Sequence, residues 1–176
     1  MIVLRYPVKA LVGDYIRAGV GLAVGLGVLA TVPASPAILI VFGGLSTLFG
    51  VFGLRTVKRH VTEIEVGDIG IRTQGMGTAA LPWPELETMK LRYYGTRRQR
   101  NRGEGEGFMQ LTLRGAGASL TLESSVQGFE YIAWRAAKAA RDKGLSLDPT
   151  SAGNLLDLGI DADDEQPPPS LQAPKL

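Results

Sequence analysis

A cluster of arginines beside two tyrosines is the part of the sequence best suited to bind a charged ligand. Arg92 precedes Tyr93 and Tyr94, and four more basic side chains follow within six positions: Arg97, Arg98, Arg100 and Arg102. Guanidinium groups bind phosphate and carboxylate oxygens, and each base near an anionic leaflet is worth about 1 kcal/mol. We therefore predict a lipid- or partner-binding surface made of these five arginines and Tyr94. A solvated loop without a ligand is the alternative, because Glu104 and Glu106 follow directly.

RNA binding is a weaker interpretation of the same cluster. Arginine contacts phosphate, and tyrosine stacks on bases. The alternation of the segment, however, places Tyr93 toward the core and leaves only Tyr94 outside. One exposed ring makes a poor stacking platform, so we do not expect nucleic acid as a partner.

Residue types for catalysis or metal binding are scarce. The chain has no cysteine, which excludes disulfides, thiolate metal sites and a cysteine nucleophile. Its single histidine, His60, follows two basic residues, as a solvated residue near a membrane would. Glu63 and Glu65 share one strand face, which a solvated edge explains better than acid–base chemistry. We predict a protein that is not an enzyme and that holds no metal or cofactor.

The elements that carry these residues begin with an apolar segment. Residues 18–54 include no charged side chain over 37 positions, and prolines at 33 and 36 divide them. We predict two transmembrane helices, over about 12–32 and 36–54. The uncharged part of the second spans roughly 28 Å, close to the hydrocarbon thickness of a bilayer. A buried soluble hairpin is less favoured, because a small domain cannot cover so much apolar chain.

Basic residues flank both helices, whereas their connection has no charge. They are Arg5, Lys9 and Arg17 before the first helix, and Arg55, Lys58 and Arg59 after the second. The positive-inside rule therefore predicts an integral membrane protein with both termini in the cytoplasm and the proline-rich connection outside. A cleaved signal peptide over residues 1–34 is the alternative, since Val32-Pro33-Ala34 resembles a cleavage site.

Small residues recur along the first helix in two rows. Gly21 and Gly25 form a GxxxG pattern, and Gly19, Ala23 and Gly27 form the second row. Small side chains let helix backbones approach closely in a membrane. We expect the two helices to pack on each other through these rows. Dimerisation or docking onto a larger membrane complex is the alternative.

Beyond Arg59 the hydrophobic period changes from helical to alternating. Six antiparallel strands are predicted between residues 62 and 122, with turns at 67–68 and 115–117. A helix over 127–143 should place Phe129 and Ile132 on the sheet. We divide the chain at the following bounds: a hairpin over 1–56, a domain over 57–144, a short helix within 145–160, and a disordered acidic, proline-rich tail over 161–176.

Three segments of the domain carry a family resemblance: Thr62–Thr73, Leu81–Leu86 around Trp83, and the helix that begins near Gln127. Together they resemble the bacterial pleckstrin-homology-like domains that follow a pair of membrane helices, which implies a location in a bacterial inner membrane. The resemblance implies a mostly antiparallel β barrel or sandwich capped by a C-terminal helix, with Trp83 in its core. Phosphoinositide-binding members carry bases between their first two strands. Residues 66–69 have none here, so that ligand is not carried over.

These observations predict a non-catalytic binding or scaffolding protein that presents its domain to the inner leaflet or to a protein partner. The expected partners are the bilayer, anionic lipid headgroups and a membrane or cytoplasmic protein. An accessory or assembly subunit, docked on a larger complex through the glycine-rich hairpin, is the competing function. The tail carries four acids between Asp161 and Glu165, so we also expect it to compete with anionic lipid for the arginines.

Overall fold

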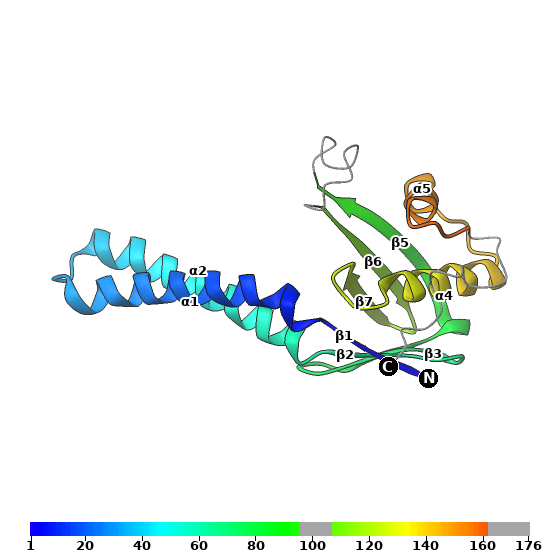
Figure 1. Cartoon of the computed structure of the whole chain (residues 1–176), viewed down its shortest axis with the longest axis horizontal. Helices are drawn as coiled ribbons and strands as arrows, with labels where there is room; N and C mark the ends of the chain where they lie inside the picture. The colour runs from blue at the N-terminus through cyan, green and yellow to red at the C-terminus, as the bar shows by residue number, and fades with distance from the viewer. Residues whose placement is uncertain (96–106, 162–176) are drawn as a thin grey trace. The chain divides into compact units, whose positions relative to one another are not determined.

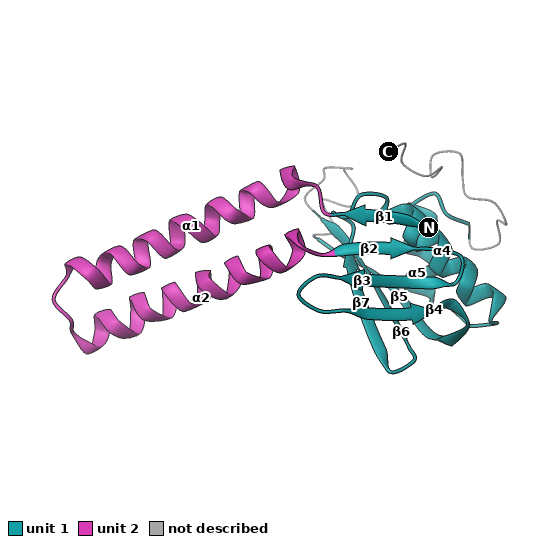
Figure 2. Ribbon diagram, turned by 90° about the horizontal axis from the view of Figure 1, so that it is seen from below, with its two compact units in different colours: residues 1–5, 63–176 teal, residues 6–62 magenta. Residues whose placement is uncertain are grey.

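The computed structural model describes residues 1–95 and 107–161. It divides into two compact units, which we describe separately (Figure 2). The hairpin unit comprises residues 6–62. The sheet unit comprises residues 1–5 together with the chain from Glu63 onward. The four arginines at 97, 98, 100 and 102 lie outside the described residues.

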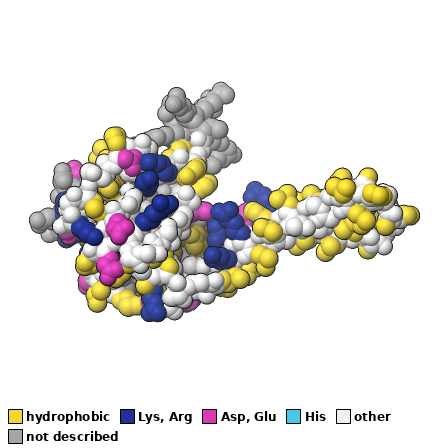
Figure 3. Space-filling model, turned by 180° about the vertical axis from the view of Figure 1, so that it is seen from behind, with side chains coloured by type: hydrophobic (Ala, Val, Ile, Leu, Met, Phe, Trp, Pro, Cys, Tyr) yellow, Lys and Arg dark blue, Asp and Glu magenta, His cyan; other side chains and the backbone are white. Residues whose placement is uncertain are grey.

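The hairpin unit consists of α1 (Val8–Thr31) and α2 (Pro36–His60). Ser35 caps α2, because its Oγ accepts the Ile38 amide at 3.3 Å. By length and composition both helices can cross a membrane. α1 begins before, and α2 ends after, the bounds expected from the uncharged run. Figure 3 shows apolar side chains over the visible face of the hairpin, and α2 exposes these: Leu39, Ile40, Val41, Leu48, Val51 and Leu54.

Only one of the two small-residue rows lies between the helices. A side chain at Gly21 would collide with the Phe49 ring, and one at Gly25 would collide with Ser46. At Gly19 and Gly27 nothing lies within 4 Å, and Ala23 is exposed. Residues two positions apart in an α-helix differ by about 200° of rotation, so Gly19, Ala23 and Gly27 lie on the face opposite Gly21 and Gly25. The expectation that both rows pack within the hairpin thus applies to the first row alone.

The first sheet has the order β1-β2-β3-β4 and is antiparallel throughout. Its strands are β1 (Ile2–Arg5), β2 (Glu63–Val66), β3 (Gly70–Gln74) and β4 (Ala79–Pro82). The sequence did not indicate β1, which precedes the hairpin and pairs with β2 in a register that opposes Arg5 to Glu63. A chain cleaved after Ala34 would lose this strand, which speaks against the signal-peptide alternative.

The second sheet has the order β5-β6-β7. A short 3-10 turn, η1 (Trp83–Glu85), leads into β5 (Leu86–Tyr94), and β6 (Phe108–Gly115) and β7 (Ala118–Glu123) follow. The tight β6–β7 turn has positive φ at Ala116 and Gly117. The described chain therefore has seven strands in two antiparallel sheets that do not close into a barrel.

Two helices complete the sheet unit, α4 (Phe129–Asp142) and α5 (Pro149–Asp157). In Figure 1, α4 crosses the face of the second sheet. It buries Phe129 and Ile132, as its helical spacing predicts, and ends at Gly144 with φ +68°. Trp134 is also buried, although helical spacing puts it on the face opposite Phe129 and Ile132. The central core residues have no exposed area: Ile64, Leu81, Leu86, Leu91, Leu111 and Leu113.

Candidate functional site

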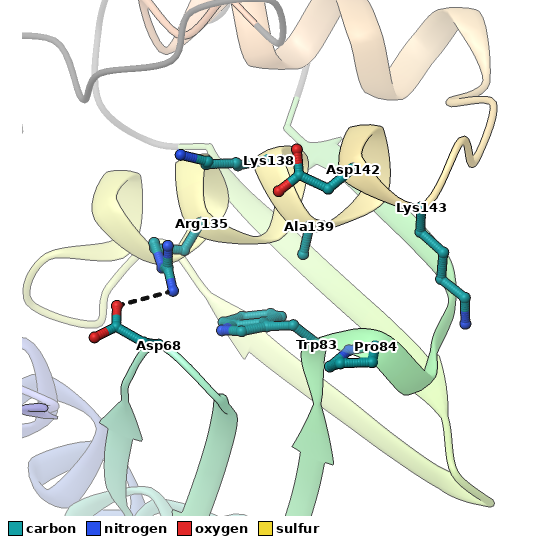
Figure 4. A pocket seen from close by; sticks show the side chains of 8 residues that line it. All are labelled: Asp68, Trp83, Pro84, Arg135, Lys138, Ala139, Asp142 and Lys143. Carbon is teal, nitrogen blue, oxygen red and sulfur yellow. Dashed lines mark hydrogen bonds and ion pairs between the residues drawn. The ribbon is translucent and has the colours of Figure 1, made fainter.

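A pocket of about 410 Å³ lies between α4, η1 and the β2–β3 turn. We call it the Trp83 pocket (Figure 4). Its lining combines three bases, two acids and three apolar residues: Asp68, Trp83, Pro84, Arg135, Lys138, Ala139, Asp142 and Lys143. All of these belong to the sheet unit, so the site is complete within one compact body.

Trp83 forms one wall of the pocket and is fixed by two hydrogen bonds. Its indole Nε1–H donates to the Gly67 carbonyl at 2.9 Å, and its backbone N–H donates to the Ile69 carbonyl at 2.9 Å. Prolines on both sides restrict the backbone of η1. The ring faces Ala139 of α4 (Figure 4), and this short side chain leaves open space beside the indole. Trp83 is 6% exposed, so a small, fixed part of the ring is accessible from the pocket.

Arg135 crosses from α4 to the β2–β3 turn. Its guanidinium donates to the Gly67 carbonyl at 3.1 Å and to Asp68 Oδ1 at 3.3 Å. Its Cζ lies 5.9 Å from the ring centroids of both Trp83 and Trp134, a distance at which cations interact with aromatic faces. Among the described residues its buried Nε has no hydrogen-bond partner. The Arg135 guanidinium is therefore fixed by its contacts with Gly67 and Asp68, while one of its N–H groups has no hydrogen bond within the described residues.

The ion pair between Arg135 and Asp68 is asymmetric. The Arg135 side chain is 15% exposed, whereas that of Asp68 is fully exposed. Asp68 loses almost no hydration by making the contact, and such pairs contribute little to stability. Another carboxylate or phosphate could therefore replace it beside the guanidinium at small cost. Lys143 supplies a second cation at the other end of the pocket (Figure 4).

The described lining combines an indole ring, a proline, an alanine, two carboxylates and three cationic groups. These groups can bind apolar and anionic parts of a ligand. Over residues 1–95 and 107–161, no cluster of three potential metal-ligating side chains is found. An acidic segment that also carries an apolar or proline side chain matches these groups.

The predicted binding residues that the structure describes lie elsewhere. Arg92 donates to Asp148 Oδ1 at 2.7 Å and to Ser151 Oγ at 3.3 Å, so it connects β5 to α5. The Arg92 hydrogen bond, followed by one from Ser151, holds the pKa of Asp148 far below its usual range. Tyr94 is 48% exposed and stacks on Phe108 with ring centroids 5.4 Å apart.

Arg92 belongs to a polar contact that covers the outer edge of β5. The Leu91 N–H donates to Ser151 Oγ at 2.9 Å, and Asn154 Nδ2 donates to the Leu91 carbonyl at 2.8 Å. Both α5 side chains are buried. They satisfy backbone groups that a neighbouring strand would otherwise satisfy, which protects an open sheet edge. This gives Arg92 a structural role, and its ligand-binding role stays a prediction.

The remaining sequence candidates take structural positions. Trp83, Phe129 and Ile132 are all buried, although Trp83 begins a 3-10 turn and does not lie within a strand. Glu63 pairs with Arg5, and Glu65 accepts a hydrogen bond from Gln74, so both glutamates have neighbours within the first sheet. In the hairpin unit, His60 Nδ1 lies 3.0 Å from the Tyr15 hydroxyl.

Comparison with known proteins identifies no relative. No protein-family model, curated protein or solved structure matches the chain. The two apolar helices, the two antiparallel sheets and the Trp83 pocket therefore provide the basis for a functional assignment. The sequence analysis missed the pocket, because Arg135 and Asp68 are 67 positions apart. The nearest hint was Trp83 between two prolines, which indicates a fixed aromatic side chain.

Proposed function

We propose that this protein is a membrane-anchored, non-catalytic binding or scaffolding protein, whose pleckstrin-homology-like sheet unit serves the inner leaflet or a protein partner. The Trp83 pocket is the observation that carries the proposal. It joins a fixed indole to Arg135 and Lys143 and offers groups for recognition rather than for chemistry. A protein segment with acidic and apolar side chains is the partner that these groups fit.

Anchoring through the hairpin is supported by its exposed apolar side chains and its flanking bases. In α2, Lys58, Arg59 and His60 occupy the last turn, whereas the turn between the helices has no charge. This pattern favours cytoplasmic termini. Topology reporters attached before Met1 and after Leu176 should both report the cytoplasm. A periplasmic signal from the C-terminal reporter would reject this orientation.

Affinity purification of the full chain in mild detergent tests the binding role. We expect a stoichiometric partner with the wild-type chain and with the control Lys90→Glu, which reverses an exposed lysine on β5. Ala139→Phe, which fills the pocket, and Lys143→Glu, which reverses its charge, should each lose most of that partner. Equal thermal midpoints would show that all four chains are folded. Equal partner recovery by all four would rule out the Trp83 pocket as the binding site.

An accessory subunit of a larger membrane complex is the second candidate, favoured by the small-residue row that α2 does not cover. Gly19 and Gly27 have nothing within 4 Å, and Ala23 lies between them on the same face. Such rows permit close helix contacts in membranes. If this function holds, Ala23→Leu should release a co-purifying membrane protein, whereas Ala139→Phe should retain it.

A further inference from the structure

The lining of the Trp83 pocket fits a peptide segment that carries an apolar side chain close to acidic side chains. The indole and Ala139 favour a flat or cyclic apolar side chain, and Arg135 and Lys143 favour carboxylates beside it. The chain itself contains such a segment immediately after the last described residue, Asp161. Its acids are Asp163, Asp164 and Glu165, and Pro167, Pro168 and Pro169 follow after one glutamine.

We propose that residues 161–169 bind the Trp83 pocket of their own chain, with prolines against Trp83 and Ala139 and carboxylates toward Arg135 and Lys143. The inference rests on the proposed function, because it makes the tail a competitor of the protein partner at the same site. The tail thereby keeps the binding surface closed until a partner of higher affinity displaces it.

Charge complementarity supports this occupant. The three bases of the pocket outnumber its two acids, and one of those acids, Asp68, is fully exposed beside Arg135. A tail carboxylate can take its place without removing a buried partner. Three consecutive prolines favour the extended polyproline II conformation, so this segment loses less conformational entropy on binding than an ordinary one. Aromatic surfaces are the usual binding sites of such segments.

The tail begins on the same compact unit as the pocket. Pro167 lies six positions after Asp161, so an extended chain can place it up to about 20 Å from that residue. The tail starts next to Ile160, which is buried in the sheet unit. A segment tethered this closely has an effective concentration in the millimolar range, so a weak contact is sufficient to occupy the pocket.

Disulfide trapping in the full chain tests the proposal, because the native sequence has no cysteine. The reporting pair is Pro84→Cys with Ser170→Cys. The matched control is Glu130→Cys with Ser170→Cys, since Glu130 is exposed on the same helix as the pocket but about 18 Å from Asp142 along α4. In nanodiscs under mild oxidation, the pocket pair should form an intramolecular disulfide about tenfold faster than the control.

Two further changes to the trapping experiment, a charge reversal and added salt, test whether carboxylate contacts hold the tail in the pocket. Adding Lys143→Glu, or raising the salt concentration, should slow the pocket pair and leave the control unchanged, because both weaken the carboxylate contacts. Equal rates for the two pairs would overturn the proposal. A product that is mainly intermolecular would place the tail in the pocket of a second copy, and would also overturn it.

Partner capture separates the tail proposal from the proposed function. A chain that ends at Asp161 should recover several-fold more partner than the full chain, and Asp163→Asn with Asp164→Asn should give an intermediate amount. If Ala139→Phe loses the partner but truncation changes nothing and the trapping rates are equal, only the tail proposal fails. If fast trapping is specific to the pocket but no pocket variant alters partner recovery, the tail contact stands and the pocket's role in partner binding fails.

Discussion

The hairpin unit and the sheet unit contain the same apolar residue types, but they place them in opposite surroundings. In α2, Ile40 is 75% exposed and Leu48 is 64% exposed. In the sheet unit, Ile64 and Leu91 have no exposed area. The sheet unit therefore buries its apolar residues in its own core, whereas the hairpin leaves many of its apolar side chains exposed. If the hairpin spans a membrane, as we propose, lipid covers these side chains.

Glycine shows the same contrast. In the hairpin, Gly21 and Gly25 let α1 approach Phe49 and Ser46 of α2. In the sheet unit, Gly117 and Gly144 take positive φ values of 71° and 68°, where they allow a strand turn and a helix end. One unit uses the missing side chain for space, and the other uses it for backbone freedom.

Removing the Trp83 ring should have the largest effect, and it should act on the sheet unit alone. Trp83→Ala is expected to lower the free energy of unfolding by about 3–5 kcal/mol, because it removes a buried aromatic ring and its hydrogen bond to the Gly67 carbonyl. Denaturant unfolding of the full chain in detergent measures it. The control Met76→Ala, at a 59% exposed site, should change stability little. An unchanged Trp83→Ala chain would mean that the ring is not part of a packed core.

A charge on the exposed face of each unit tests the difference in solvent directly. Leu48→Arg in α2 should disfavour membrane insertion by about 2.5–3.5 kcal/mol, as charges near a bilayer centre do. Ile69→Arg, at an 83% exposed position of the sheet unit, should insert like the wild type. A glycosylation-based insertion assay compares the two. Normal insertion of Leu48→Arg would contradict a spanning role for α2.

A smaller effect on the stability of the hairpin should distinguish the two small-residue rows of α1. Gly25→Val places a side chain against Ser46 and the Phe42 carbonyl, and is expected to destabilise the hairpin by about 1–3 kcal/mol. Gly19→Val meets nothing within the chain and should leave hairpin stability unchanged. Thermal unfolding in detergent micelles compares them. Equal midpoints would mean that α1 and α2 do not pack through Gly25.

The smallest effect concerns acid stability, and it should appear only in the sheet unit. Because the folded-state pKa of Asp148 lies below its unfolded value of 3.8, its ion pair with Arg92 stabilises the fold above that value. This contribution is lost as the pH falls below 3.8 toward the folded pKa. Asp148→Asn should therefore show a flatter dependence of thermal midpoint on pH in this window. An identical slope in both chains would reject the linkage.

Local patterns predicted the elements that depend on neighbours in sequence. The two apolar helices, the turn at Gly67-Asp68 and the end of α4 at Gly144 all follow from adjacent residues. β1 escaped prediction because it is four residues long and its partner strand lies beyond the hairpin.

The candidate site depends on contacts between distant residues, and these were harder to predict. The contact of Arg92 with Asp148 could not be predicted, because Asp148 is 56 positions away and reaches Arg92 only when α5 covers the edge of β5. The Trp83 pocket likewise needs the β2–β3 turn to reach α4. From the sequence, the density of charge indicated only the arginines between positions 92 and 102.

The pairing of β1 with β2 has a consequence for the biogenesis of the protein. The first strand leaves the ribosome before the hairpin, yet its partner strand is synthesised only after Thr62. If the two helices insert into a membrane, as we propose, an antiparallel pair returns the chain to the side from which it started. Insertion would then bring Arg5 close to Glu63 and would favour the pairing of β1 with β2. A fragment that starts at residue 57 lacks β1 and leaves β2 as a bare edge.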